Sequence, residues 1–198
     1  MRTGYTFIGF YHYRKRGNIL ANQKELDQFL ASVERRAYRM AEIATGSADD
    51  ALDIVQDAMY KLVQKYAIKS PAEWGPLFQT ILQSRIMDYH RRNTVRNKYM
   101  AWLGRKDEEN MVDPLETVAD EKAVNPESEV DQVTCMQVLE RAVRDLPPRQ
   151  QQAFMLRALE GLDVAQTASV MKCSQGSVKT HYFRAISVLR ERLGDYKI

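Results

Sequence analysis

The sequence predicts an all-α protein made of two small helical domains that are joined by an acidic linker. Apolar residues recur at the three- and four-residue spacing of amphipathic helices through much of 23–106 and again in 132–198. Residues 107–131 lack a sustained apolar period and hold ten acidic residues and one lysine, which is typical of a linker. A chain of 198 residues is long enough for two modest cores.

Charge is distributed unevenly along the chain. The whole sequence has a net charge of +3, and residues 107–131 alone contribute −9, so the remainder carries about +12. A surplus of this size favours a polyanionic partner such as nucleic acid. No apolar run approaches the roughly 18 residues that a membrane-spanning helix needs, and the N-terminus lacks the apolar core of a signal peptide. We therefore expect a cytoplasmic protein without membrane insertion.

The residue pattern of an enzyme is missing from the sequence. Cys135 and Cys173 are far apart and match no metal-ligand spacing, so they are expected to be free thiols, with a redox switch as the alternative. We find no carboxylate cluster with metal-ligand spacing, no phosphate-binding glycine loop and no nucleophile–base motif. A binding protein without metal or cofactor is therefore expected, in preference to a nucleic-acid enzyme.

The first domain is expected to contain three helices after an N-terminal arm. Residues 1–22 are aromatic and basic without a clean period, which suits either a weakly ordered tail or an arm that touches nucleic acid. An amphipathic helix is expected over about 23–45, and a second helix is expected to open at Asp49 or Asp50. Its inward residues are expected to be Leu52, Val55, Met59, Leu62, Val63 and Tyr66.

A third helix is predicted to begin at the capping box Ser70-Pro71-Ala72-Glu73, with a possible interruption at Gly75-Pro76. From Arg85 onward its character changes, because residues 85–106 hold seven Arg or Lys residues against one acidic residue. Basic side chains attract phosphates and aromatic rings stack on unpaired bases, so this pattern indicates capture of a single strand. The residues expected to make these contacts are Arg85, Asp88, Tyr89, His90, Arg91 and Arg92.

Two further aromatic residues in this basic stretch, Tyr99 and Trp102, are assigned to the core and left out of the site. The alternative for the whole stretch is a basic helix end whose aromatic residues belong to the core.

The second domain contains the spacing of a helix-turn-helix. Pro147-Pro148 suits the start of a helix that Gly161 ends, and Asp163 and Ser174 suit the caps of the next two helices. In the last helix a buried stripe is expected from Val178, Tyr182, Ala185 and Leu189. The opposite face presents Ser177, Lys179, Thr180, His181 and Arg184. Such side chains suit base edges and phosphates in a major groove, although a solvated basic helix face is the alternative.

The segments DLPPRQQQAFMLRALEGL, DVAQTASVM and SQGSVKTHYFRAISVLRERL together resemble region 4 of the sigma-70 family, in its small two-domain, extracytoplasmic-function form. The resemblance implies that the last helix reads the −35 promoter element. The sequence departs from the family where glutamates and an isoleucine are usual, at Ala165, Gln166 and Thr167. It also has Lys172 where the turn usually has glycine.

The first domain carries two further resemblances to this family. DALDIVQDAMYKLVQKY resembles region 2.2, which implies that Asp53, Gln56 and Asp57 dock on the clamp helices of the RNA polymerase largest subunit. Ordinary helix-dipole electrostatics is the alternative for this acidic face. WGPLFQTILQSRIMDYHRR resembles regions 2.3 and 2.4, which implies melting and reading of the −10 element. Leu77-Phe78 and Ser84 depart from the usual Trp-Leu pair and Asn.

Together these features predict a sigma factor that directs promoter recognition, promoter melting and transcription initiation. The resemblance implies core polymerase as partner, including the flap of its second-largest subunit, together with promoter DNA and an anti-sigma factor. The acidic linker is either a solvated tether or a mimic of nucleic acid. The alternative function is a free-standing helix-turn-helix regulator of duplex DNA, which leaves residues 49–92 without a role.

Overall fold

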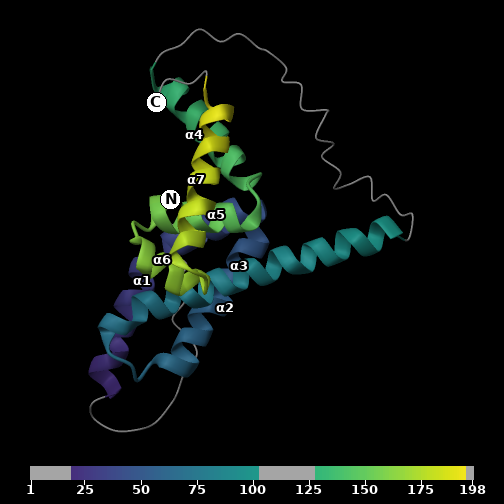
Figure 1. Cartoon of the computed structure of the whole chain (residues 1–198). Helices are drawn as coiled ribbons and strands as arrows, with labels where there is room; N and C mark the ends of the chain where they lie inside the picture. The colour runs from purple at the N-terminus through teal and green to yellow at the C-terminus, as the bar shows by residue number, and fades with distance from the viewer. Residues whose placement is uncertain (1–18, 103–127, 195–198) are drawn as a thin grey trace.

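The computed structural model describes residues 19–102 and 128–194, and these residues form helices joined by short turns. The first part consists of α1 (Ile19–Thr45), α2 (Ala48–Tyr66) and α3 (Pro71–Trp102). The second part consists of α4 (Ser128–Arg144), α5 (Pro148–Phe154), the π-helical turn η1 (Met155–Leu159), α6 (Val164–Met171) and α7 (Gln175–Arg192). Within these described ranges there is no strand, so the all-α prediction is confirmed. Figure 1 shows α3 leaving the body as a long arm.

The turn between α1 and α2 depends on Gly46, whose φ of +72° is a conformation that side-chain-bearing residues rarely adopt. Its N–H donates to the carbonyl of Glu42 at 2.8 Å. Ser47 then caps α2, because its side chain accepts from the N–H of Asp50 at 3.3 Å. The expectation that Asp49 or Asp50 opens this helix was therefore wrong by one or two residues, because the serine hydroxyl already fills the capping position.

The buried face of α2 is built largely from small residues. Its buried residues are Ala51, Ile54, Val55, Ala58 and Leu62. Leu52 was expected to point inward, but its side chain is 47% exposed. The two alanines allow α1 to approach closely, and this places the buried stripe one position away from Leu52.

Helix α3 passes through Pro76 without interruption. Its inward stripe includes Trp74, Phe78, Leu82 and Ile86, all almost fully buried. The indole Nε1–H of Trp74 donates to the carbonyl of Tyr66 at 3.1 Å, which ties the start of α3 to the end of α2. Burial of large apolar side chains contributes about 1.5–3 kcal/mol each, and this stripe outweighs the single helix hydrogen bond that a proline removes.

The two helical parts share one apolar core. Helix α4 lies against α1, and α5 and α6 lie against α3. The residues that the second part adds to the buried cluster of α1–α3 are Ala142, Val143, Leu146, Met155, Ala185, Leu189 and Leu193. A second cluster within the helix-turn-helix joins Leu156, Met171 and Val178 with their neighbours. The predicted domain boundaries stay predictions, since residues 1–18 and most of 107–131 lie outside the described ranges; Ser128–Asp131 belong to α4.

Polar contacts also join the two parts. Arg39 of α1 forms an ion pair with Glu140 of α4. A Cβ at Gly46 would lie only 3.2 Å from the side chain of Arg144. Burial raises the pKa of Glu160 in the second part, an effect that Arg36 and Gln79 of the first part oppose. The first and second parts are therefore held together by both apolar and polar contacts.

The turn of the helix-turn-helix has a left-handed residue at Lys172, with φ 53° and ψ 51°. Helix α6 before it begins with a capping box, in which Asp163 accepts from the N–H of Gln166 at 2.7 Å. The predicted caps at Asp163 and Ser174 are confirmed. Gly161, predicted to end the preceding helix, has a φ of +67°. A lysine therefore holds the turn in a conformation that glycine adopts more easily.

Replacing Lys172 with glycine should stabilise the protein. A left-handed conformation costs an L-residue about 1–2 kcal/mol, and the extra freedom of glycine in the unfolded chain offsets about 0.5–1 kcal/mol of that gain. We expect the free energy of unfolding, measured by urea denaturation, to rise by roughly 0.5–1 kcal/mol. Lys172→Ala is the matched control, because alanine keeps the strain and should change little. Equal stability of the glycine and alanine variants would contradict the strain argument.

Candidate nucleic-acid interface

The first half of α7 presents a polar, basic face. Ser174 fixes the start of the helix, because its Oγ accepts from the N–H of Ser177 at 3.1 Å. The apolar stripe then turns inward, with Val178, Ala185 and Leu189 buried. The side chains left exposed on the other face include Lys179, Thr180 and Arg184. The helix therefore has the two faces that the sequence predicts, one in the core and one open to a partner.

Two predicted contact residues on α7 are half-buried, Ser177 and His181. The Ser177 hydroxyl lies 2.9 Å from that of Ser174, and the Thr180 hydroxyl donates to the carbonyl of Gly176 at 3.0 Å. Burial lowers the pKa of His181, and the positive charges of Arg149 and Arg184 lower it further. This shift favours the neutral His181 ring, which has one donor and one acceptor nitrogen.

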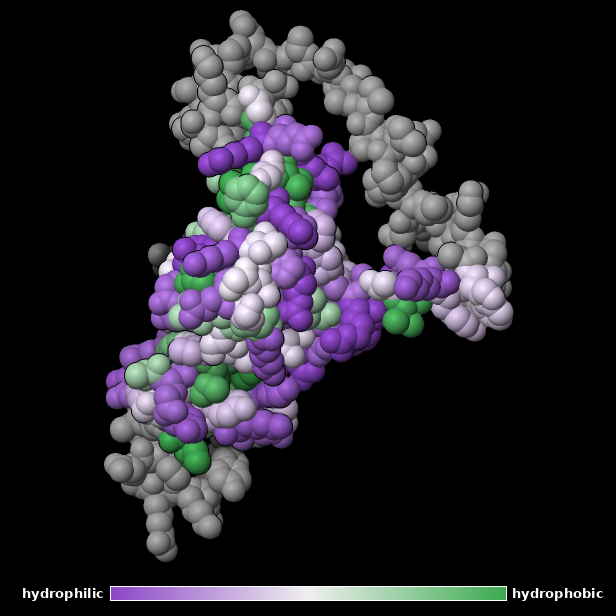
Figure 2. All heavy atoms as spheres, in the orientation of Figure 1, coloured by the Kyte–Doolittle hydropathy of each residue, from purple (hydrophilic) through white to green (hydrophobic). Residues whose placement is uncertain are grey.

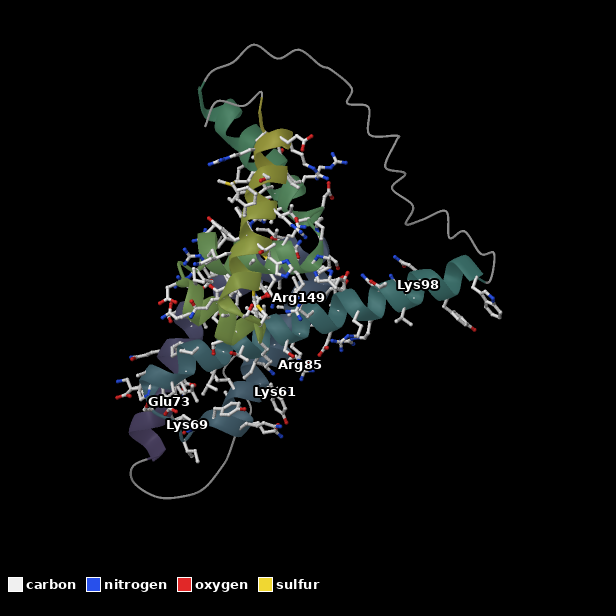
Figure 3. The ribbon with its side chains drawn as sticks, viewed as in Figure 1. Lys61, Lys69, Glu73, Arg85, Lys98 and Arg149 are labelled. Atoms are coloured by element: carbon white, nitrogen blue, oxygen red, sulfur yellow. The ribbon has the colours of Figure 1, made fainter. Side chains whose placement is uncertain are left out.

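Arg149 adds positive charge beside this face and was not among the predicted contact residues. Its guanidinium donates to Gln152 Oε1 at 3.0 Å and to the carbonyl of Met171 at 3.1 Å, which joins α5 to the end of α6. Figure 3 shows Arg149 on the second part of the molecule, with Arg85 below it on α3. The Leu-Pro-Pro-Arg motif contained this residue, but only the fold brings it to His181.

The end of α3 offers a second charged face. Arg85 Nε lies 3.3 Å from Asp57 Oδ2 of α2, and Arg91 Nη1 lies 3.1 Å from Asp88 Oδ1. Arg92 Nε donates to the carbonyl of Asp88 at 3.4 Å, which is a long contact. Because Asp88 pairs with one arginine and orients another, its role in the structure is to organise the basic side chains around it.

Tyr89 and His90 point toward the body of the protein instead. The Tyr89 hydroxyl donates to the carbonyl of Thr45 at 3.3 Å, so it holds α3 against α1. His90 Nε2 lies 3.2 Å from Gln151 Oε1 of α5, so it joins the two parts of the molecule. The six residues predicted for the −10 strand therefore divide into three pairs. Arg91 and Arg92 are exposed, Arg85 and Asp88 are half-buried in ion pairs, and Tyr89 and His90 point inward.

The acidic face of α2 lies beside the basic face of α3. Asp53, Gln56 and Asp57 are all exposed, and Asp57 is the one that pairs with Arg85. The predicted polymerase-binding residues thus form one surface that adjoins the predicted DNA-binding surface. The structure brings these two groups together, while the predicted −35 residues lie on the other part of the chain.

Tyr99 and Trp102 are not core residues. Their side chains are 58% and 80% exposed, so their assignment to the core was wrong. Their spacing resembles a buried stripe, but α3 extends past the helices that would cover it (Figure 1). No sequence signal marks where the neighbouring helices stop.

Among the residues whose positions the structure describes, no three His, Cys, Asp or Glu side chains gather to hold a metal ion. No helix there is both long and apolar enough to span a membrane.

Comparison with known proteins identifies the family. Residues 136–189 match the family described as sigma-70, region 4. The chain is 28% identical to the ECF RNA polymerase sigma factor BldN of Streptomyces coelicolor, over 80% of this chain and 56% of the length of BldN. It is 29% identical to the ECF RNA polymerase sigma-E factor of Escherichia coli K12, over 77% of this chain and 80% of that protein. The chain is therefore similar to extracytoplasmic-function sigma-70 factors along most of its length, and residues 136–189 match their region 4.

The fold agrees with this identification. The sigma factor RpoE of Bartonella quintana, solved in complex with the anti-sigma factor NepR, superposes with a TM-score of 0.60 and 22% identity. The match covers 88% of this chain and 99% of RpoE. The matches to BldN and sigma-E, which cover 80% and 77% of this chain, disfavour the free-standing regulator, because it accounts for the second part alone. A sigma factor is a non-enzymatic specificity subunit, so the prediction that the chain is not an enzyme is confirmed.

His90 should make the stability of this sigma factor depend on pH. Burial lowers its pKa, and the hydrogen bond that its Nε2–H donates to Gln151 Oε1 opposes part of that shift. A folded-state pKa below the usual value of about 6.5 means that the unfolded chain takes up the proton first. The buried contact of neutral His90 therefore contributes fully to the free energy of unfolding above about pH 6.5. That contribution is lost as the pH falls through the folded-state pKa.

We therefore expect the free energy of unfolding to fall more between pH 7.5 and 5.5 in the wild type than in His90→Gln. Glutamine can still donate to Gln151 but does not titrate. Urea denaturation at the two pH values measures both proteins. An equal loss in the two proteins would show that His90 is not held in the buried contact.

Proposed function

We propose that this sigma factor binds RNA polymerase through α2, captures the melted −10 strand on α3 and reads the −35 element with α7. The observation that carries the proposal is the adjacency of an acidic face on α2 and a basic face on α3, linked by the Asp57–Arg85 contact of 3.3 Å. One short surface thus offers opposite charges to two kinds of partner. The region 4 match over residues 136–189 supports the third contact.

Docking on the polymerase uses the exposed side chains of Asp53, Gln56 and Asp57. Acidic and polar groups on one helix face suit the basic surface of a partner helix, in this case the clamp helices of the largest subunit. The flap of the second-largest subunit is the proposed contact of the second helical part. This assembly takes place in the cytoplasm.

Strand capture uses the basic residues of α3, of which Arg91 and Arg92 are exposed and Arg85 is half-buried beside Asp57. Arg85, Arg91 and Arg92 attract the phosphates of the non-template strand, and aromatic stacking offsets melting by about 1–3 kcal/mol per base. Tyr89 and His90 now take part in contacts with α1 and α5. In the proposed mechanism these two rings become available to DNA only after those contacts open.

The proposed promoter contacts require the two parts to separate. The −35 and −10 elements are about 25 base pairs apart, which at about 3.4 Å per base pair is roughly 85 Å of DNA. The longest described helix, α3, has 32 residues and is therefore about 48 Å long. Because the two parts share a core, we propose that they separate when both elements are bound and that the packing described here is that of the protein away from the promoter. The Bartonella relative is in complex with an anti-sigma factor, and we propose a partner of that class for this chain.

The function is tested by run-off transcription with core polymerase, the full chain and a library of genomic fragments. Transcripts from defined start sites are expected only when the chain is added. Arg184→Ala and Lys179→Ala should each lower promoter-specific transcription by about fivefold or more, because base and phosphate contacts are worth about 1–3 kcal/mol. Binding to core polymerase should persist. Lys24→Ala, an exposed lysine on α1, is the matched control. Loss of core binding in the α7 variants would contradict the assignment.

Docking through α2 is tested with the double variant Asp53→Ala, Gln56→Ala. Both side chains are exposed, so the fold should be unaffected, and affinity for core polymerase should fall about fivefold or more. Fluorescence anisotropy with labelled sigma factor measures this affinity. Asp27→Ala, Gln28→Ala on α1 removes the same two chemical groups elsewhere and should have no effect. Unchanged affinity of the α2 variant would exclude the proposed docking face.

A further inference from the structure

The last three turns of α3, Arg91–Trp102, project from the body (Figure 1). At about 100° per residue, one side of this segment spans about 160° and gathers all of its basic residues together with the three large apolar residues described as exposed. That side carries Arg91, Arg92, Val95, Arg96, Lys98, Tyr99 and Trp102. The opposite side carries the neutral polar residues Asn93, Thr94 and Asn97. We name the first side the arm face.

The arm face combines exposed rings with positive charge. The ring centroids of Tyr99 and Trp102 lie 6.2 Å apart and the ring planes are tilted by 33°, so the two rings form one neighbouring pair of exposed aromatic surfaces. Residues 89–102 contain no acidic residue, and the nearest one, Asp88, pairs with Arg91. Figure 3 shows Lys98 far out on this segment, while Arg85 lies near the body. Figure 2 shows mainly hydrophilic residues over this arm, with a small hydrophobic patch among them.

Charge complementarity indicates the partner of the arm face. Its cations require a polyanion, and its rings require flat surfaces to stack on; an unpaired nucleic-acid strand supplies both. Duplex DNA supplies the phosphates but keeps its bases stacked on one another. The arm face also continues the stripe that begins at Arg85 and Arg92, since positions 85, 92, 96 and 99 fall within about 60° of one another around the helix.

We propose that the arm face is a binding site for single-stranded nucleic acid, in which Tyr99 and Trp102 stack on bases while Arg96 and Lys98 bind phosphates. The site extends the strand-capture surface by about 15 Å beyond Arg92, since a helix rises about 1.5 Å per residue. This inference rests on the proposed function, because it lengthens the path of the same strand. It adds two aromatic residues that the sequence pattern assigns to the core.

The test uses the full chain and the oligonucleotide (dT)12. The chain has two tryptophans, of which Trp74 is 1% exposed and Trp102 is 80% exposed. Acrylamide should therefore quench mainly Trp102, and (dT)12 should protect that fluorescence. Trp102→Phe identifies the quenched component, because it leaves only the buried Trp74.

Affinity for labelled (dT)12 is then compared among variants. Tyr99→Ala, Trp102→Ala should weaken binding about tenfold or more, because each stacked base contributes substantially to affinity. Tyr99→Phe, Trp102→Phe should restore most of it, whereas Tyr99→Leu, Trp102→Leu should not. Ile68→Ala, which truncates an exposed apolar residue on another surface, is the control and should bind as the wild type does.

Several results would overturn the proposal. These are unprotected Trp102 fluorescence, unchanged affinity of the alanine pair, or full rescue by leucine, which would indicate an apolar protein or lipid contact. Selective loss of core polymerase binding in the alanine pair would assign the face to the polymerase instead. Run-off transcription from defined sites, measured in parallel with the wild type, tests the proposed function separately. If the wild type binds (dT)12 but gives no transcripts from defined sites, the proposed function is contradicted, and the arm face remains a strand-binding site.

Discussion

The burial of one face of α3 decides which of its residues remain free for partners. Trp74, Phe78, Leu82 and Ile86 lie almost fully buried, and burial of each such side chain contributes about 1.5–3 kcal/mol. This stripe fixes the rotation of the helix about its axis. Arg85, on another face, is thereby directed toward α2. A helix this long ends far beyond its covered part, and its last turns are left without neighbours among the described helices.

Much of the fold could be predicted from period and capping chemistry, since these are local properties. Asp163 and Ser174 cap their helices as expected because a side-chain oxygen there needs only a backbone N–H nearby. The burial of Leu52 was predicted wrongly. The spacing of apolar residues shows that α2 has an apolar face, but the small alanines beside Leu52 decide which line of residues on that face α1 packs against. Tyr99 and Trp102 were misplaced because the period carries no information about where the covering helices end.

The candidate site was predicted unevenly for the same reason. The open face of α7 follows from its apolar stripe, so the period of the sequence is enough to place Lys179 and Arg184 on it. Contacts between distant segments give no comparable signal. The His90–Gln151 and Arg39–Glu140 contacts join residues 61 and 101 positions apart, and none of the four side chains is unusual for a helix surface. The packing of the two parts on each other is therefore a property of the fold that no local pattern predicts.

The ion pair between Asp57 and Arg85 makes the two neighbouring surfaces thermodynamically dependent on each other. A cationic group that engages Asp57 leaves Arg85 without its partner, and a phosphate that engages Arg85 does the same to Asp57, so each event favours the other by the same factor. Asp57 is exposed while Arg85 is half-buried, and an ion pair worth about 1 kcal/mol would give a cooperativity of roughly fivefold. Such coupling modestly favours the state in which both partners are bound, while each partner can still bind alone.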